Sequence, residues 1–184
     1  MWLHMEYKYL LELLKSGLYQ EFAIDFSRAG VPFLDENVYG RSTLENSSFI
    51  VSSANPNPAL HGKGFVARLS GSTAEFLSMW RLMFFGPKPF SVNDDGELTA
   101  EFSPAIPSYL IPTDGEVGAM FLGKTEVVYH FTDQRDYFPG TYHVAAIELS
   151  KDHNMAVRFE GEKLYGEDAV RLRAGEYSRA DVFF

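Results

Sequence analysis

Apolar residues recur at helical spacing through the first part of the chain. Between residues 2 and 19 they fall three and four positions apart, which predicts an amphipathic helix with one buried face. The residues expected on that face are Tyr7, Leu10, Leu11, Leu14 and Leu18. Lys15-Ser16-Gly17 begins the expected C-terminal end, where a cation and a glycine are both common. A second, shorter helix is expected over residues 20–29, before Gly30 and Pro32.

The pattern becomes irregular between residues 31 and 68. Asn55-Pro-Asn-Pro58 and His61-Gly-Lys-Gly64 break any regular element there, and one helix is expected between residues 43 and 53. A loop-rich stretch of this length in a compact domain is usually functional or disordered. This one carries too many aromatic and aliphatic residues for disorder, so we expect an ordered loop region.

Helical spacing returns over residues 72–85, and Gly86-Pro87 ends it. The residues on its broad apolar face are Phe76, Met79, Trp80, Met83 and Phe84. Ser72 and Glu75 match a capping box, with the serine as N-cap and the glutamate three residues later.

Two small residues, Ser70 and Gly71, precede this expected helix. A glycine lets backbone N–H groups approach a ligand closely, and a helix N-terminus offers N–H donors and partial positive charge to a phosphate. Glu75 counts against an anion, because it places a negative charge in the same first turn. On the residues alone, the pattern favours an ordinary capped core helix over an anion site.

After Pro89 the periodicity changes to alternation and to runs of β-branched and aromatic residues, which predicts strands. The expected strands cover residues 97–102, 116–122, 125–131, 142–149, 155–160 and 178–184. Leu122-Gly-Lys124 and Asn93-Asp-Asp-Gly96 are turn sequences, and residues 167–174 form a possible short helix before Gly175. We therefore expect an α+β protein with a helical segment, 1–86, and a β-sandwich-like domain, 87–184.

Composition and charge argue against several classes of partner. The net charge of −9 and the lack of a basic run argue against nucleic acid and anionic membranes as partners. The chain has no cysteine, which fits a reducing cytoplasm, and no apolar run of the ~20 residues that span a membrane. Aromatic residues make up 15% of the chain, which suits either sugar stacking or an aromatic core.

Candidate chemistry is sparse. The five histidines show no metal-binding spacing, and Gly62-Lys-Gly64 lacks the context of a phosphate loop, so we expect no metal and no cofactor. Arg41, Glu45 and Asn46 lie together in a polar decapeptide, residues 39–48, whose groups suit the hydroxyls of a substrate. The same groups could equally tie down their own backbone.

Four stretches resemble the C-terminal part of family 94 glycoside phosphorylases, which act on cellobiose, chitobiose and β-1,2-oligoglucans. Residues 39–53 (Tyr39-Gly-Arg-Ser-Thr-Leu-Glu-Asn-Ser-Ser onward) and 68–76 (Arg68-Leu-Ser-Gly-Ser-Thr-Ala-Glu-Phe) carry most of the likeness. Phe102-Ser-Pro-Ala-Ile-Pro-Ser-Tyr-Leu is similar to the signature before that family's last β domain. Trp2-Leu-His4 resembles the start of a late helix of its (α/α)6 barrel.

The resemblance implies phosphorolysis of a β-glucoside with inversion, giving α-glucose 1-phosphate. It assigns phosphate binding to His4, Ser70 and Gly71. The family's general acid is an aspartate far upstream, with no counterpart in these 184 residues, so the resemblance implies no catalytic residue here and no activity of the chain alone.

These expectations describe the C-terminal fragment of an inverting β-glucan phosphorylase, with inorganic phosphate and a β-glucan oligosaccharide as ligands of the parent enzyme. A non-catalytic carbohydrate-binding or interaction module is the alternative. Barrel helices outside their ring expose apolar faces, for instance Phe76 and Trp80 or Leu10 and Leu14. We therefore expect self-association or pairing with the missing barrel.

Overall fold

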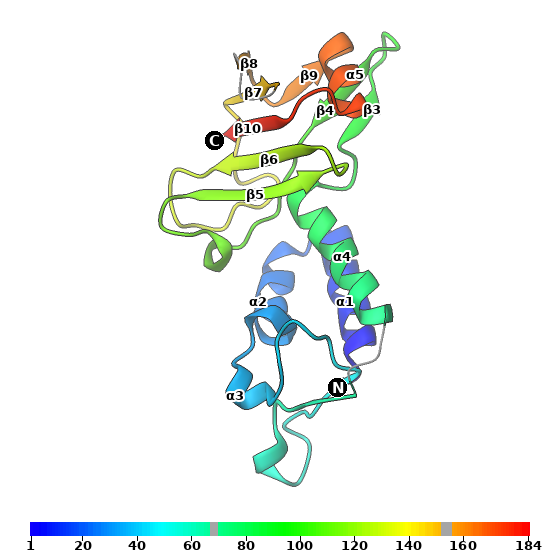
Figure 1. The fold of residues 1–184 in the computed structure, drawn as a ribbon, viewed down its shortest axis with the longest axis vertical. Coiled ribbons are helices and arrows are strands. Elements are labelled where there is room, and N and C mark those ends of the chain that lie inside the picture. The colour runs from blue at the N-terminus through cyan, green and yellow to red at the C-terminus, as the bar shows by residue number, and fades with distance from the viewer. Residues whose placement is uncertain (67–69, 152–155) are drawn as a thin grey trace. The chain divides into compact units, whose positions relative to one another are not determined.

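The computed structural model describes residues 1–66, 70–151 and 156–184 (Figure 1). It is an α+β protein whose chain divides into two compact units, Met1–Arg81 and Leu82–Phe184. Each unit is described separately below. Among the described residues, no helix has the length and apolar character required to cross a membrane.

Two helices of the first unit, α1 (Leu3–Lys15) and α2 (Tyr19–Ala29), follow the predicted apolar spacing. The apolar face of α1 is buried, with Tyr7 and Leu10 fully inaccessible to solvent. The helix is shorter than the expected 2–19, because Gly17 adopts φ +74° and its N–H bonds back to Leu14 O. Leu18 lies beyond this end and is 45% exposed, so its assignment to the buried face was wrong.

Residues 31–66 fold into short elements joined by turns. They are η1 (Val31–Phe33), α3 (Glu36–Tyr39), β1 (Phe49–Ile50), η2 (Pro58–Leu60) and β2 (Gly64–Phe65). The helix expected between residues 43 and 53 is absent from this described segment. β1 occupies part of that range instead, pairs antiparallel with β2 and leaves its apolar residue Ile50 in the core.

Helix α4 (Ser70–Phe85) begins two residues before the expected start. Ser72 is therefore inside the helix and fully buried, so the predicted capping box with Glu75 was wrong. Residues 67–69, and with them any cap that precedes α4, lie outside the described residues. At the other end Gly86 adopts φ +76° and donates its N–H to Leu82 O, which ends the helix where Gly86-Pro87 predicted.

The second unit contains a five-stranded sheet of order β5-β6-β10-β7-β8 and a three-stranded sheet of order β3-β4-β9. β10 runs parallel to β6, and the other neighbouring strands are antiparallel. The strands are β3 (Phe90–Val92), β4 (Leu98–Glu101), β5 (Glu116–Phe121), β6 (Thr125–His130), β7 (Ala146–Ser150), β8 (Val157–Glu160), β9 (Lys163–Tyr165) and β10 (Arg179–Phe183). The remaining elements are η3 (Ser108–Leu110) and α5 (Gly166–Ala174).

Alternation along these strands buries one face of the five-stranded sheet. Val127, Tyr129, Ile147, Leu149 and Val182 on that face have no more than trace exposure. Phe121 of β5 adds ring contacts to Phe85, Phe90 and Phe102, with ring centroids 4.8, 5.7 and 5.3 Å from its own. Most of the aromatic residues of this unit therefore form its core.

The structure confirms that the turn sequences form turns. Leu122 and Gly123 have φ values of +50° and +70°, and Lys124 N–H bonds to Phe121 O in the tight turn between β5 and β6. The side chain of Asn93 accepts the backbone N–H groups of Asp95 and Glu97 between β3 and β4. Gly175 ends α5 in the left-handed region, as its position predicted.

Candidate functional site

His4 and Gly71 lie in contact within the first unit. His4 is on the first turn of α1, and Gly71 is the second residue of α4. The imidazole lies so close to the Gly71 backbone that a β-carbon at position 71 would come within 2.7 Å of Nδ1 and 2.8 Å of Cε1. Only glycine fits this approach with the ring in place. The structure thus brings together two of the three residues expected to bind phosphate.

The third expected residue, Ser70, is the first residue of α4. Its side chain lies outside the described part of the structure, so its hydroxyl has no described position. The backbone of Ser70 and Gly71 belongs to the first turn of α4, whose N–H groups lack helical acceptors and carry partial positive charge.

Glu75 approaches the other side of the His4 ring. Its Oε1 lies 3.6 Å from Nε2, a distance suited to an ion pair rather than a short hydrogen bond. The two side chains are 26% and 20% exposed, so water screens the pair only in part. Glu75 is thus the acidic partner of His4 at Nε2, whereas Nδ1 is the ring nitrogen beside Gly71.

Asn46 joins the polar groups near the start of α4. Its Nδ2 lies 3.4 Å from Thr73 Oγ1, and its Oδ1 accepts a hydrogen bond of 3.2 Å from Tyr7 Oη. Tyr7 Oη in turn accepts the buried N–H of Val31 at 3.1 Å, and burial raises the pKa of this tyrosine above its ordinary range. Tyr7 therefore remains a neutral hydroxyl that holds Asn46 beside the first turn of α4.

Arg41 and Glu45, the other expected substrate-binding residues, form a separate pair. Arg41 Nη1 donates to Gly64 O at 3.2 Å, and Arg41 Nε lies 3.9 Å from Glu45 Oε2. Within the described residues, Arg41 Nε is buried without a hydrogen-bond acceptor, and neither side chain bonds to His4 or Asn46. The structure therefore brings Asn46 to Thr73 in the first turn of α4, whereas Arg41 and Glu45 pair with each other.

Tyr39 fixes the shape of the segment that carries these three residues. Its hydroxyl is buried, accepts the N–H of Ser47 at 3.0 Å, donates to Glu45 O at 2.8 Å and lies 2.5 Å from Ser47 Oγ. Sequence reasoning missed Tyr7 and Tyr39 as supports of the site. The available signal was a tyrosine in an apolar pattern, because a buried phenol requires polar partners.

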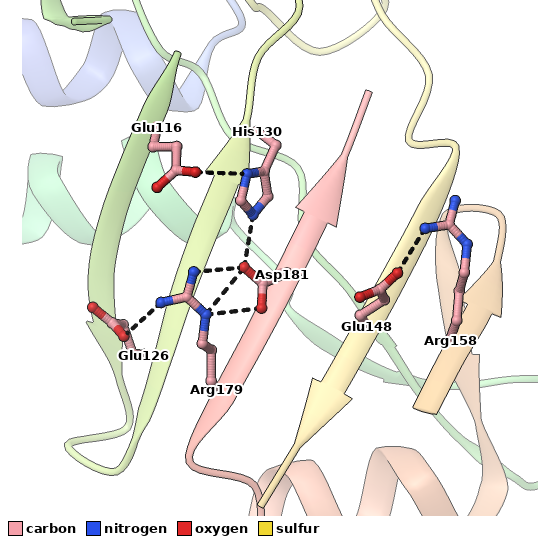
Figure 2. Close-up of polar contacts among 7 residues, drawn as sticks. All are labelled: Glu116, Glu126, His130, Glu148, Arg158, Arg179 and Asp181. Atoms are coloured by element: carbon pink, nitrogen blue, oxygen red, sulfur yellow. Dashed lines mark hydrogen bonds and ion pairs between the residues drawn. The ribbon is translucent and has the colours of Figure 1, made fainter. Parts of the chain in front are cut away.

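A second polar cluster covers the outer face of the five-stranded sheet (Figure 2). His130 on β6 lies between two carboxylates, with Nε2 2.6 Å from Asp181 Oδ1 and Nδ1 3.4 Å from Glu116 Oε1. Arg179 pairs with Asp181 at 2.7 Å and with Glu126 at 3.1 Å. These charged side chains form ion pairs with one another across three strands. Such cross-strand pairs are typical of the solvent-exposed face of a sheet.

Comparison with protein-family models and with curated proteins finds no match. The argument about function therefore rests on this chain's own residues and on the motif resemblance. Within the described residues, no three His, Cys, Asp or Glu side chains form a group that could hold a metal ion.

The contact between Gly71 and His4 predicts that Gly71→Ala changes the free energy of unfolding differently in the wild-type chain and in the His4→Ala chain. Glycine to alanine within a helix normally stabilises by about 0.5–1 kcal/mol. We expect Gly71→Ala to lose that gain in the wild-type chain, because the new methyl group displaces the His4 ring. In the His4→Ala background the gain returns, and chemical denaturation of the four chains measures the difference. Equal effects in both backgrounds would contradict the contact.

The ion pairs of Asp181 should make the free energy of unfolding decrease in acid. Although burial opposes ionisation, hydrogen bonds from Arg179 and His130 lower its pKa below the ordinary value. The stabilisation is therefore complete above the unfolded pKa of about 3.9 and disappears as pH falls through the lower folded value. Asp181→Asn should cost about 1 kcal/mol at pH 7, with the cost shrinking below about pH 4. Urea unfolding across pH measures this, with the exposed turn residue Asp94→Asn as control, and a cost independent of pH would contradict it.

Proposed function

We propose that this chain is the C-terminal part of an inverting β-glucan phosphorylase of family 94. In this proposal residues 1–86 supply the last helices of an (α/α)6 barrel, and residues 87–184 form a β-sandwich-like domain. The two sheets of the second unit and the paired helices α1 and α2 are compatible with it. The lack of cysteine and the acidic charge favour a cytoplasmic protein with no nucleic-acid or membrane partner.

The contact between His4 and Gly71 carries the proposal. These residues are 67 positions apart, and the resemblance names both as phosphate ligands. A phosphate at the first turn of α4 would receive hydrogen bonds from backbone N–H groups and from the His4 ring. Glu75 lies at the Nε2 atom of that ring, 3.6 Å away.

The reaction assigns these residues a limited role. A phosphate oxygen attacks the anomeric carbon while the bond from that carbon to the glycosidic oxygen breaks, and the general acid gives its proton to the departing oxygen. His4 and Gly71 hold and orient the attacking phosphate. The acid comes from the upstream barrel of the parent enzyme, so the chain contributes nucleophile positioning and no proton transfer.

Self-association or pairing with a barrel forms part of this proposal. Leu10 and Leu14 are buried, so they cannot supply the exposed faces that were expected, and Phe76 and Trp80 are half-buried. Exposed large apolar residues of the first unit include Trp2, Met5, Tyr9, Phe49 and Phe65, each 44–51% exposed. We expect concentration-dependent dimers in sedimentation velocity, and Trp2→Ser should weaken them. A monomer at millimolar concentration would contradict this.

An aromatic row at the same place favours the alternative, a carbohydrate-binding module. Trp2 forms an isolated β-bridge with Phe49, and Phe49 is paired with Phe65 between β1 and β2. Three half-exposed aromatic residues therefore lie at neighbouring positions in the strand pairing. Such a row suits the apolar faces of sugar rings. Binding of β-glucans to the isolated chain that Phe49→Ser abolishes and His4→Ala leaves unchanged would favour this module over the phosphorylase fragment.

Complementation tests the proposed function. A family 94 barrel that lacks its own C-terminal part is combined with this chain, and release of glucose 1-phosphate from a β-1,2-glucan is measured. We expect activity from the mixture, and His4→Ala should raise the KM for phosphate more than the KM for the glucan. Lys8→Ala on the exposed face of α1 is the matched control. Unchanged phosphate kinetics in an active His4→Ala mixture would reject the phosphate role.

A further inference from the structure

An open pocket of about 230 Å³ lies within the second unit. Its walls come from the end of β4, from the irregular segment between β6 and β7, and from the turn between β8 and β9. The polar groups that line it include Glu101, Glu162 and His143. His143 was expected within a strand, but it precedes β7 and its side chain is 94% exposed.

Both carboxylates of the pocket have a basic partner that leaves acceptor positions open. Glu101 Oε2 lies 3.0 Å from Lys163 Nζ, and Glu162 Oε1 lies 3.1 Å from His143 Nδ1. Each ionised carboxylate has about four lone-pair positions, so a single ion pair leaves most of them available to hydroxyl donors. Hydrogen bonding with Glu101 raises the pKa of Lys163, which keeps that pair ionised at neutral pH.

Much of the remaining wall is apolar. Phe102, Pro139, Tyr142 and Val144 line it, and the hydroxyl of Tyr142 is turned to Pro104 O, to which it donates at 2.7 Å. An amphipathic ligand matches this division between an apolar wall and carboxylate acceptors. A pyranose has this character, with C–H groups on its faces and hydroxyls on its rim.

Size and charge narrow the choice of ligand. The volume is below the range of about 300–1,000 Å³ typical of sites for drug-sized molecules, which suits a single sugar residue. Two carboxylates repel an anion, so a sugar phosphate fits poorly. Lys163 already neutralises the charge of Glu101, which weakens the attraction of the pocket for a further cation but leaves acceptor positions for neutral hydroxyl groups.

We propose that this pocket binds one neutral hexose residue, as a non-catalytic subsite for the sugar chain. The inference rests on the proposed function for the choice of a glucan, and it concerns residues remote in sequence from His4 and Gly71. Hydroxyl groups of the sugar donate to Glu101 and Glu162, and its apolar face lies against the wall that Phe102 and Tyr142 line.

Amide and side-chain NMR with glucose and sophorose as probes tests the pocket on the intact chain. We expect chemical shift changes that saturate at millimolar sugar concentrations and are confined to residues around the pocket. Glu162→Gln should weaken sugar binding roughly tenfold, because an ionised acceptor becomes a neutral amide. Glu101→Gln serves as a second variant, and Glu176→Gln, an exposed glutamate paired with Lys151, is the control.

The outcomes separate the pocket from the proposed function. The sugar site would be rejected if the sugar changed chemical shifts elsewhere in the protein. It would also be rejected if the shift changes persisted in folded Glu101→Gln and Glu162→Gln variants. Spermidine that binds in the pocket more tightly than glucose also overturns it, because the pocket would then select a cation. Phosphate shifts at His4 without sugar shifts at the pocket reject only this inference. Sugar binding at the pocket without phosphate binding at His4 rejects only the phosphate role.

Discussion

The isolated chain should release no detectable glucose 1-phosphate from sophorose, longer β-1,2-glucans or cellobiose in the presence of phosphate. The resemblance provides no general acid within the 184 residues, and loss of an acid alone typically costs about 10² to 10⁴ in rate. Loss of the subsites that position the sugar removes a further contribution of roughly 7–11 kcal/mol. Together these losses place turnover below the detection limit.

An assay for glucose 1-phosphate, coupled to phosphoglucomutase, measures this expectation. An intact family 94 phosphorylase under the same conditions is the positive control, and the His4→Ala chain shows whether any signal depends on the proposed site. Robust turnover by the wild-type chain that His4→Ala abolishes would mean that the acid lies within these residues. The family alignment, and the limited role given to this chain, would then be wrong.

Tyr39→Phe should destabilise the first unit by about 1–3 kcal/mol, the usual cost of leaving a buried donor unsatisfied. The lost hydroxyl is the acceptor for Ser47 N–H and the donor to Glu45 O, and Tyr39 is 1% exposed. No water can replace it without opening the core. Since these bonds fix residues 39–48, the change should also disturb the neighbourhood of Asn46.

Urea unfolding of the variant measures the loss, and hydrogen exchange at residues 39–48 locates it. Tyr165→Phe, which removes a hydroxyl from a side chain that is 55% exposed, is the matched control and should change stability by less than about 0.5 kcal/mol. Equal stability of the two variants would show that the Tyr39 hydroxyl does not organise the segment.

Periodicity predicted the long elements well, because burial of one face determines them. Helices α1, α2 and α4 and strands β5 and β6 begin and end within four residues of their expected bounds. The errors occur where local bonds compete with periodicity. α1 ends early because Gly17 reverses the backbone. Residues 43–53 contain turns and β1 because Tyr39 donates to Glu45 O and Ser48 donates to Val66 O.

The short elements were missed for a different reason. β3 and β9 each have three residues, too few for alternation to stand out from a loop. α3 has four residues, and its signal is only the cap in which Asp35 accepts the N–H of Asn37. These elements depend on contacts between distant segments, such as the pairing of Ala100 with Leu164, which no local pattern records.

The candidate site was partly accessible from the sequence. The resemblance named His4 and Gly71, and the structure adds the contact between them. It also gives Glu75 a different partner from the expected one. Glu75 was expected to pair with Ser72 in a capping box, whereas its Oε1 lies 3.6 Å from His4 Nε2. Arg41 and Glu45 could not be separated from Asn46 without coordinates, because all three belong to one polar segment.

Titration of the isotopically labelled chain with inorganic phosphate tests the central claim most directly, with chloride at matched ionic strength as reference. We predict saturable shifts at the His4 ring and at the Gly71 amide, and loss of the Gly71 shift in His4→Ala. Lys8→Ala should leave the titration unchanged. Shifts absent from His4 and Gly71, or a Gly71 shift that persists in His4→Ala, would contradict the account.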